Sequence, residues 1–191
     1  MVQRETSFSW GLNRELQDHK RSYLSTLQWL RKSQMRLQNQ SHLLYDPLDI
    51  PAYLRFTRSP TAGANVLFLG TTRNNFDHRP VSRLSYSAYP SLALKSLHAI
   101  ADDVQKKHGL EKVAIVHRLG EVKIEEESIA VAVSSGHRAS AWKAAEEILE
   151  RVKARAEIWK REWFADTGEV EEGVWRANKD RDGHGNVVQP N

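Results

Sequence analysis

Apolar residues recur along the chain with two periods, and each period predicts one kind of element. Between Pro90 and Gly109 they recur every three or four residues, which predicts a helix with proline in its first turn and a glycine cap. A second stretch with this period starts at His137 and predicts a central helix that runs to about Lys153. The apolar positions are Ala93, Leu97, Ile100, Ala101 and Val104 in the first helix, and Ala141, Ala144, Ala145, Ile148, Leu149 and Val152 in the second.

Shorter segments with continuous or alternating apolar residues predict strands. These segments are residues 65–69, 81–89, 112–119, 128–134 and 158–164. Pro51 is well placed in the first turn of a short helix that extends to Thr57, and residues 74–80 are expected to form a polar loop. Two long helices among these strands indicate an α+β or α/β core with a mostly antiparallel sheet.

The two ends of the chain differ from its middle in composition. Residues 1–42 are rich in Arg, Gln and Ser, and their weak seven-residue apolar repeat is interrupted by Lys20 and Gln34. Residues 181–191 are rich in Gly, Asp and Asn. We therefore expect a helical or mobile N-terminal extension (1–42), one domain (43–180) and a disordered tail (181–191).

Charge and composition restrict the possible functions. The formal net charge is +4, which favours anionic partners such as a phosphorylated small molecule, an acidic protein or a nucleic acid. The chain has no cysteine, so thiol nucleophiles, cysteine zinc sites and disulfides are excluded. No apolar run approaches the roughly 20 residues that a membrane helix needs, and we expect a soluble protein.

Basic residues gather at both ends of the central helix. His137 and Arg138 stand at its start, Lys153 stands near its end, and Lys160 follows shortly after. A helix N-terminus leaves its first amides unpaired and carries a partial positive charge, so the start of this helix is a candidate anion site. A solvated charged face is the competing interpretation of the same pattern.

Four motifs that occur in a fixed order carry a family resemblance. They are residues 70–74 (GTTRN), 115–120 (IVHRLG), 133–138 (VSSGHR) and 153–162 (KARAEIWKRE). Together they resemble the large, catalytic subunit of molybdopterin synthase, over about residues 43–180. The fold that this resemblance implies is α+β, with a hammerhead-like core of a mostly antiparallel sheet and two main helices, plus a small β subdomain.

The resemblance implies a cytosolic sulfurtransferase of molybdenum-cofactor biosynthesis. Such enzymes convert cyclic pyranopterin monophosphate into molybdopterin by inserting two sulfurs, and they need no cofactor or metal. The sulfur arrives on the C-terminal thiocarboxylate of a small ubiquitin-like subunit, which fits the absence of cysteine from this chain. The implied assembly is a heterotetramer, in which a homodimer of large subunits carries a small subunit at each end.

The resemblance also implies roles for individual residues. Lys153 and Lys160 correspond to the family's two active-site lysines. Lys153 is then the candidate acid or base near the partner's terminus, and Lys160 assists in substrate binding or proton transfer. Arg73, His137 and Arg138 correspond to substrate-binding residues, with His137 and Arg138 supplied across the dimer interface.

Two further positions depart from the family pattern. Lys179 lies where bacterial members have a substrate-binding arginine, so the charge is kept and the bidentate fork is lost. Ala156 and Glu157 stand where many members have a proline, and without that proline the central helix could continue and redirect Lys160.

Two other classes of function remain open at this point. A basic nucleic-acid-binding module would account for the net charge and the six tryptophans. Composition alone is also compatible with a noncatalytic scaffold.

Overall fold

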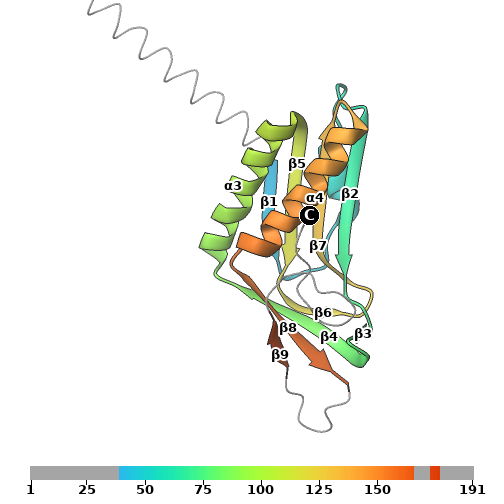
Figure 1. Ribbon diagram of the computed structural model, residues 1–191, viewed down its shortest axis with the longest axis vertical. Coiled ribbons are helices and arrows are strands. Elements are labelled where there is room, and N and C mark those ends of the chain that lie inside the picture. Colours follow the sequence, from blue (N-terminus) through green and yellow to red (C-terminus); the bar gives the residue numbers. More distant parts are fainter. Residues whose placement is uncertain (1–38, 166–172, 177–191) are drawn as a thin grey trace, which may run out of the picture. The chain divides into compact units, whose positions relative to one another are not determined.

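Two sheets and two long helices form most of the chain that the structure describes. This computed structural model describes residues 39–165 and 173–176, all of which belong to the compact unit Gln38–Asn191. The elements, in order, are β1 (Asn39–Leu44), α2 (Ile50–Thr57), β2 (Ala64–Thr71), β3 (Asn75–Phe76), β4 (Arg79–Ala88), α3 (Pro90–His108), β5 (Leu110–Arg118), β6 (Gly120–Lys123), β7 (Glu127–Ser135), α4 (Arg138–Arg155), β8 (Ile158–Phe164) and β9 (Val174–Arg176) (Figure 1). None of the helices in these described residues is long and apolar enough to cross a membrane.

The first sheet has the strand order β1-β5-β7-β2. β7 pairs antiparallel with both β5 and β2, whereas β1 pairs parallel with β5. Along β7, Ile129 lies opposite Gly70 and Ser135 lies opposite Ala64 of β2. β5 and β7 are buried over most of their length because α3 and α4 cover one face of this sheet and α2 packs on the other.

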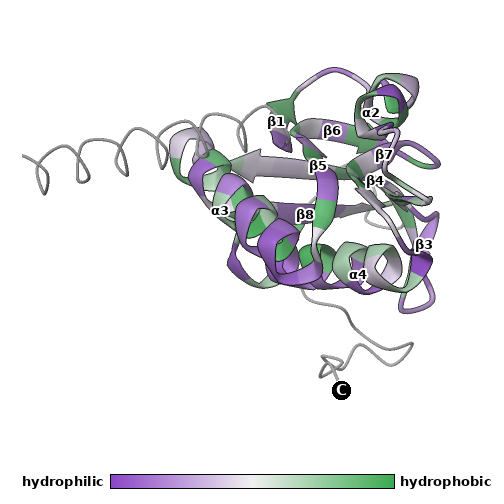
Figure 2. Cartoon of the chain, turned by 90° about the horizontal axis from the view of Figure 1, so that it is seen from above, coloured by the Kyte–Doolittle hydropathy of each residue, from purple (hydrophilic) through white to green (hydrophobic). Residues whose placement is uncertain are grey.

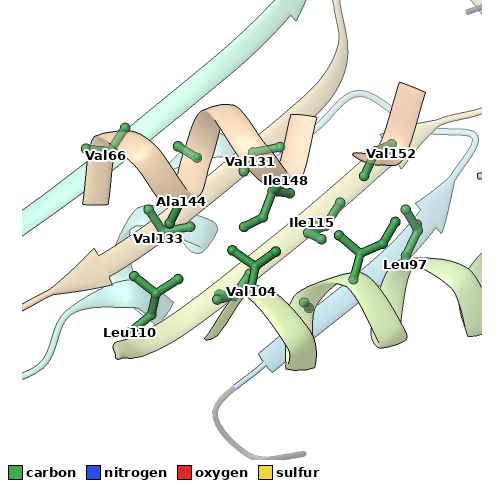
Figure 3. Packing of buried hydrophobic residues seen from close by; sticks show 14 of the residues in the cluster. Val66, Leu97, Val104, Leu110, Ile115, Val131, Val133, Ala144, Ile148 and Val152 are labelled. Atoms are coloured by element: carbon green, nitrogen blue, oxygen red, sulfur yellow. The ribbon is translucent and has the colours of Figure 1, made fainter. Parts of the chain in front are cut away.

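The two long helices are those that the apolar spacing predicts. Pro90 is the first residue of α3, and Gly109 caps this helix with φ of 62°, a left-handed conformation that glycine adopts without strain. The apolar faces of α3 and α4 turn toward the sheet, and their polar faces turn away from it (Figure 2). Leu97 and Val104 of α3 and Ile148 of α4 are almost completely buried against the first sheet (Figure 3).

The second sheet has the order β3-β4-β8-β9, and β6 also pairs with β4. The alternation along residues 81–89 is confirmed, since Tyr86 is buried on the inner face with Leu84 nearby, while Ser87 is exposed. Leu119 and Val122 are buried in the same cluster as Tyr86. All strand pairings in the described part of this sheet are antiparallel, so the predicted α+β fold with mostly antiparallel strands is confirmed.

Three features differ from the sequence-based expectation. β1 begins at Asn39, within residues assigned to the extension. The side-chain amide nitrogen of Asn39 donates to the side-chain oxygens of Asp102 and Gln105 on α3. Residues 74–80, expected to be a polar loop, contain β3, which pairs with the start of β4 in a tight hairpin. The short strand β6 was not predicted either. In both short strands the pairing with β4, rather than a local apolar pattern, creates the element.

Candidate active site

The N-terminus of α4 carries the first two candidate residues. His137 is the N-cap residue with extended backbone (φ of −132°, ψ of 139°), its side chain makes no capping hydrogen bond, and Arg138 begins the helix. Both side chains are exposed. The turn is tightly packed, because a Cβ atom on Gly63 would lie 2.6 Å from the carbonyl oxygen of Gly136. The site therefore combines fixed helix-end amides with two exposed basic side chains, which suits an anion such as a phosphate.

The C-terminus of α4 carries Lys153. Its side chain is 20% exposed, and its Nζ lies 3.9 Å from Oε1 of Glu150. The helix ends at Arg155, and Ala156 adopts an extended conformation with φ of −70°. That φ is the one a proline ring would impose, so the chain turns here without a proline, and the expectation that the helix could continue is wrong.

Lys160 lies on β8, which begins after this short turn. Its Nζ lies 2.9 Å from Oε1 of Glu162, two residues further along the same strand. Successive side chains of a strand point to opposite faces, so Lys160 and Glu162 share the inner face of the second sheet. Glu162 is only 1% exposed. Sequence reasoning assigned it no role, although the two-residue spacing from Lys160 was a usable signal.

Arg73 lies in the connection between β2 and β3, and its side chain is exposed. Two backbone hydrogen bonds fix the residue before it. The Thr72 nitrogen donates to the carbonyl oxygen of Glu126 at 3.1 Å, and the Glu125 nitrogen donates to the carbonyl oxygen of Thr72 at 2.9 Å. Arg73 is thus presented from a well-anchored segment beside the start of β7.

The structure separates these residues into two groups within one chain. Arg73 follows the end of β2 that pairs with the start of β7, whereas His137 follows the end of β7. The six residue steps from Ala64 to Gly70 span about 20 Å. Along α4, the fifteen steps from Arg138 to Lys153 span about 22 Å, so α4 carries Lys153 back toward the second sheet (Figure 1).

One end of the domain therefore holds the two lysines and Arg73, and the opposite end of α4 holds His137 and Arg138. Because a single phosphate group cannot contact guanidinium groups this far apart, one chain does not bring all five residues together. Lys179 lies outside the described residues.

His117 lies behind this site and is structural, as a lone histidine in a strand suggests. Burial lowers the pKa of His117 from 6.5 to about 4, although a hydrogen bond to the backbone of Arg118 acts in the opposite direction. The neutral ring donates from Nδ1 to the carbonyl oxygen of Arg118 at 2.8 Å, and it packs edge-on against Tyr86 with ring centroids 4.8 Å apart. Among the described residues, no cluster of three or more His, Asp and Glu side chains is arranged to hold a metal.

The family model described as MoaE protein matches residues 43–155, which is 113 of 191 residues. The chain belongs to the MoaE protein family. The MoaE match spans Arg73, His137, Arg138 and Lys153 and ends before Lys160.

Curated relatives agree with the MoaE assignment. The "Molybdopterin synthase catalytic subunit" of Aspergillus niger is 58% identical over 147 residues, which cover 77% of this chain and 79% of the relative. The protein of the same name from Coccidioides immitis is 57% identical over 144 residues, which cover 75% of this chain and 72% of the relative.

Solved structures show the same MoaE fold. Molybdopterin synthase from Staphylococcus aureus aligns with a TM-score of 0.65 and 33% identity, over 70% of this chain and 94% of that one. A complex of subunits 1 and 2 of molybdopterin-converting factor from Helicobacter pylori includes a chain that aligns with a TM-score of 0.58, over 71% of this chain and 88% of that one. At 22% identity, the second alignment supports the fold alone.

Proposed function

We propose that this chain is the catalytic subunit of a molybdopterin synthase in the cytosol. It converts cyclic pyranopterin monophosphate into molybdopterin, with sulfur delivered on the C-terminal thiocarboxylate of a small ubiquitin-like subunit. The observation that carries this proposal is the 58% identity to a curated catalytic subunit over most of both chains. The comparisons give no corresponding support to a nucleic-acid-binding module or a noncatalytic scaffold.

We assign the chemistry to the end of the domain where α4 passes into β8. Lys153 and Lys160 are separated there by a short turn, and neither side chain is fully exposed. A thiocarboxylate carries negative charge, so an extended tail that enters between them meets two cations. Lys153 exchanges the proton during sulfur transfer, while Lys160 binds the substrate or moves a second proton.

Arg73, His137, Arg138 and Lys179 bind the pterin phosphate in this proposal. The separation of Arg73 from Arg138 within one chain supports a site that a second copy completes, with His137 and Arg138 coming from the partner copy. Such an arrangement repeats twice in a symmetric dimer. A small subunit at each end then gives a heterotetramer.

The direct test is a reconstituted reaction. Purified chain, thiocarboxylated small subunit and the cyclic pterin are mixed, and dithiolene formation is followed after conversion to a fluorescent pterin derivative. We expect turnover that requires all three components. Formation of product without this chain, or none with it while the curated Aspergillus niger subunit is active in the same assay, would contradict the proposal.

Assembly gives a second, independent measurement. Light scattering on the chain with excess small subunit should give the mass of two large and two small subunits. A monomeric large subunit under these conditions would refute the cross-dimer assignment of His137 and Arg138.

A further inference from the structure

Glu162 is a buried carboxylate directly beside one of the candidate lysines. Its side chain is 2% exposed, and the Lys160 side chain that it contacts at 2.9 Å is 19% exposed. Burying a carboxylate is unfavourable unless a cation compensates it, and even a paired buried charge is a weak source of stability compared with an apolar side chain. Stability alone is therefore a poor reason for a glutamate at this position.

The residues opposite Lys160 and Glu162 on the neighbouring strands include uncharged side chains and one arginine. Tyr86 of β4 lies directly opposite Lys160, and Leu84 lies opposite Glu162. Burial is the main cause that raises the pKa of Tyr86, and the negative charge of Glu162 adds to it, so this phenol is neutral at neutral pH. His117 of β5, which packs on Tyr86, is neutral as well because its pKa is about 4. On the other side, Arg176 of β9 occupies the register position opposite Lys160.

We propose that Glu162 is a positioning residue for Lys160, holding its ammonium group in place while the anionic substrate approaches. A free lysine side chain loses rotamer entropy when it is fixed, and here the fold fixes it before the substrate binds. The strand geometry makes the pair rigid, because both residues leave the same face of β8 two positions apart. This inference rests on the proposed function only for the use that the enzyme makes of Lys160.

The first test needs no enzymatic activity. An amine-selective acylating reagent reacts with neutral lysine, and mass spectrometry measures the rate at each site. Glu162→Gln removes the neighbouring anion, and we expect Lys160 to be acylated about tenfold faster or more, since a nearby opposite charge changes a lysine's proton affinity by this order. Lys143, exposed on α4, serves as the internal reference in the same sample.

A matched variant controls for the general effect of removing a carboxylate. Glu150→Gln removes the carboxylate 3.9 Å from Lys153, where Glu150 is 41% exposed, and it should leave the labelling of Lys160 unchanged. Glu162→Asp keeps the charge but shortens the side chain by one methylene. It should hold the labelling rate near that of the native protein while lowering kcat, and it also serves if Glu162→Gln does not fold.

The second test is kinetic. Glu162→Gln should lower kcat by on the order of tenfold or more at saturating pterin, and the basic limb of the pH–rate profile should move to lower pH, because the ammonium form has lost its neighbouring anion. Unchanged Lys160 labelling in Glu162→Gln would overturn the inference, and so would a native kcat in Glu162→Asp. Faster labelling with native kcat would support the positioning role and instead refute the use of Lys160 assigned under the proposed function.

Discussion

Subunit complementation tests whether the separated residues act in one composite site. Two variants are made, Arg138→Ala at the start of α4 and Lys153→Ala at its end, about 22 Å apart along the helix. Truncating one member of a charged, hydrogen-bonded pair costs roughly 2–5 kcal/mol, so each variant alone should be about 30-fold slower or worse. The two variants are then co-expressed with different affinity tags and purified over both tags in turn.

The expected recovery follows from the geometry. In a heterodimer, one composite site contains both substitutions, while the other combines the native Lys153 of one chain with the native Arg138 of its partner. One of two sites is intact, so tandem-purified heterodimers should have about half of the native activity. If both residues instead served a site within one chain, every site would carry one substitution and no activity would return.

The control pair uses two residues from the same end of the domain. Lys153→Ala and Lys160→Ala both affect the end of α4 and the start of β8, so no heterodimer contains an intact site. Dithiolene formation is measured for both heterodimers at equal concentrations with saturating small subunit. Background activity from the Arg138→Ala and Lys153→Ala heterodimer, with the dimer shown intact by light scattering, would refute the shared site.

Three further predictions concern catalysis, boundaries and pH. Lys153→Ala should slow turnover by on the order of 10²-fold, while calorimetry should show that the small subunit still binds. Lys153→Arg should be as slow because guanidinium keeps its proton, and a near-native rate for the arginine variant would contradict the role of Lys153 in proton transfer. Removal of residues 1–37 should leave turnover within a few-fold of that of the full chain, whereas removal of residues 1–44, which deletes β1, should abolish the cooperative thermal unfolding seen by circular dichroism. The same melting curve for both truncated proteins would contradict a structural role of β1. Since the pKa of His117 falls from 6.5 to about 4 on folding, the unfolded chain binds more protons in this range, and the free energy of unfolding should drop by up to about 3 kcal/mol as the pH falls from 6.5 to 4. Urea melts should show a smaller drop over this pH range for His117→Asn, and an equal drop in both proteins would refute the prediction.

Local signals in the sequence were sufficient for the long elements. Pro90 and Gly109 mark both ends of α3, because a fixed φ suits the first helical turn and a left-handed residue suits the cap. β1 could not be predicted in the same way. Two of its buried residues, Asn39 and Ser41, are polar, and the partners of Asn39 are more than 60 positions away on α3.

The candidate residues could be predicted individually, but their arrangement could not. Motif resemblance identifies Arg73, Arg138 and Lys153. Only the antiparallel register of β2 and β7 shows that Arg73 and Arg138 lie at opposite ends of the folded domain. Glu162 was missed for a different reason. A carboxylate within a basic segment reads as solvated, and its burial depends on the strands that pair around β8.

Because Gly63 lies close to the carbonyl oxygen of Gly136, a substitution there can separate the effect of where His137 and Arg138 lie from the effect of their charge. A methyl group added by Gly63→Ala would meet a backbone atom at 2.6 Å, so Gly63 and the turn before α4 have to move apart while every ionisable side chain is retained. We expect the added methyl group to displace His137 and Arg138 by steric repulsion without changing the chemical nature of either side chain. A loss of pterin affinity in Gly63→Ala would then measure how strongly substrate binding depends on the positions of these two side chains. Substitutions of His137 or Arg138 cannot give this measurement, because they remove the side chain itself.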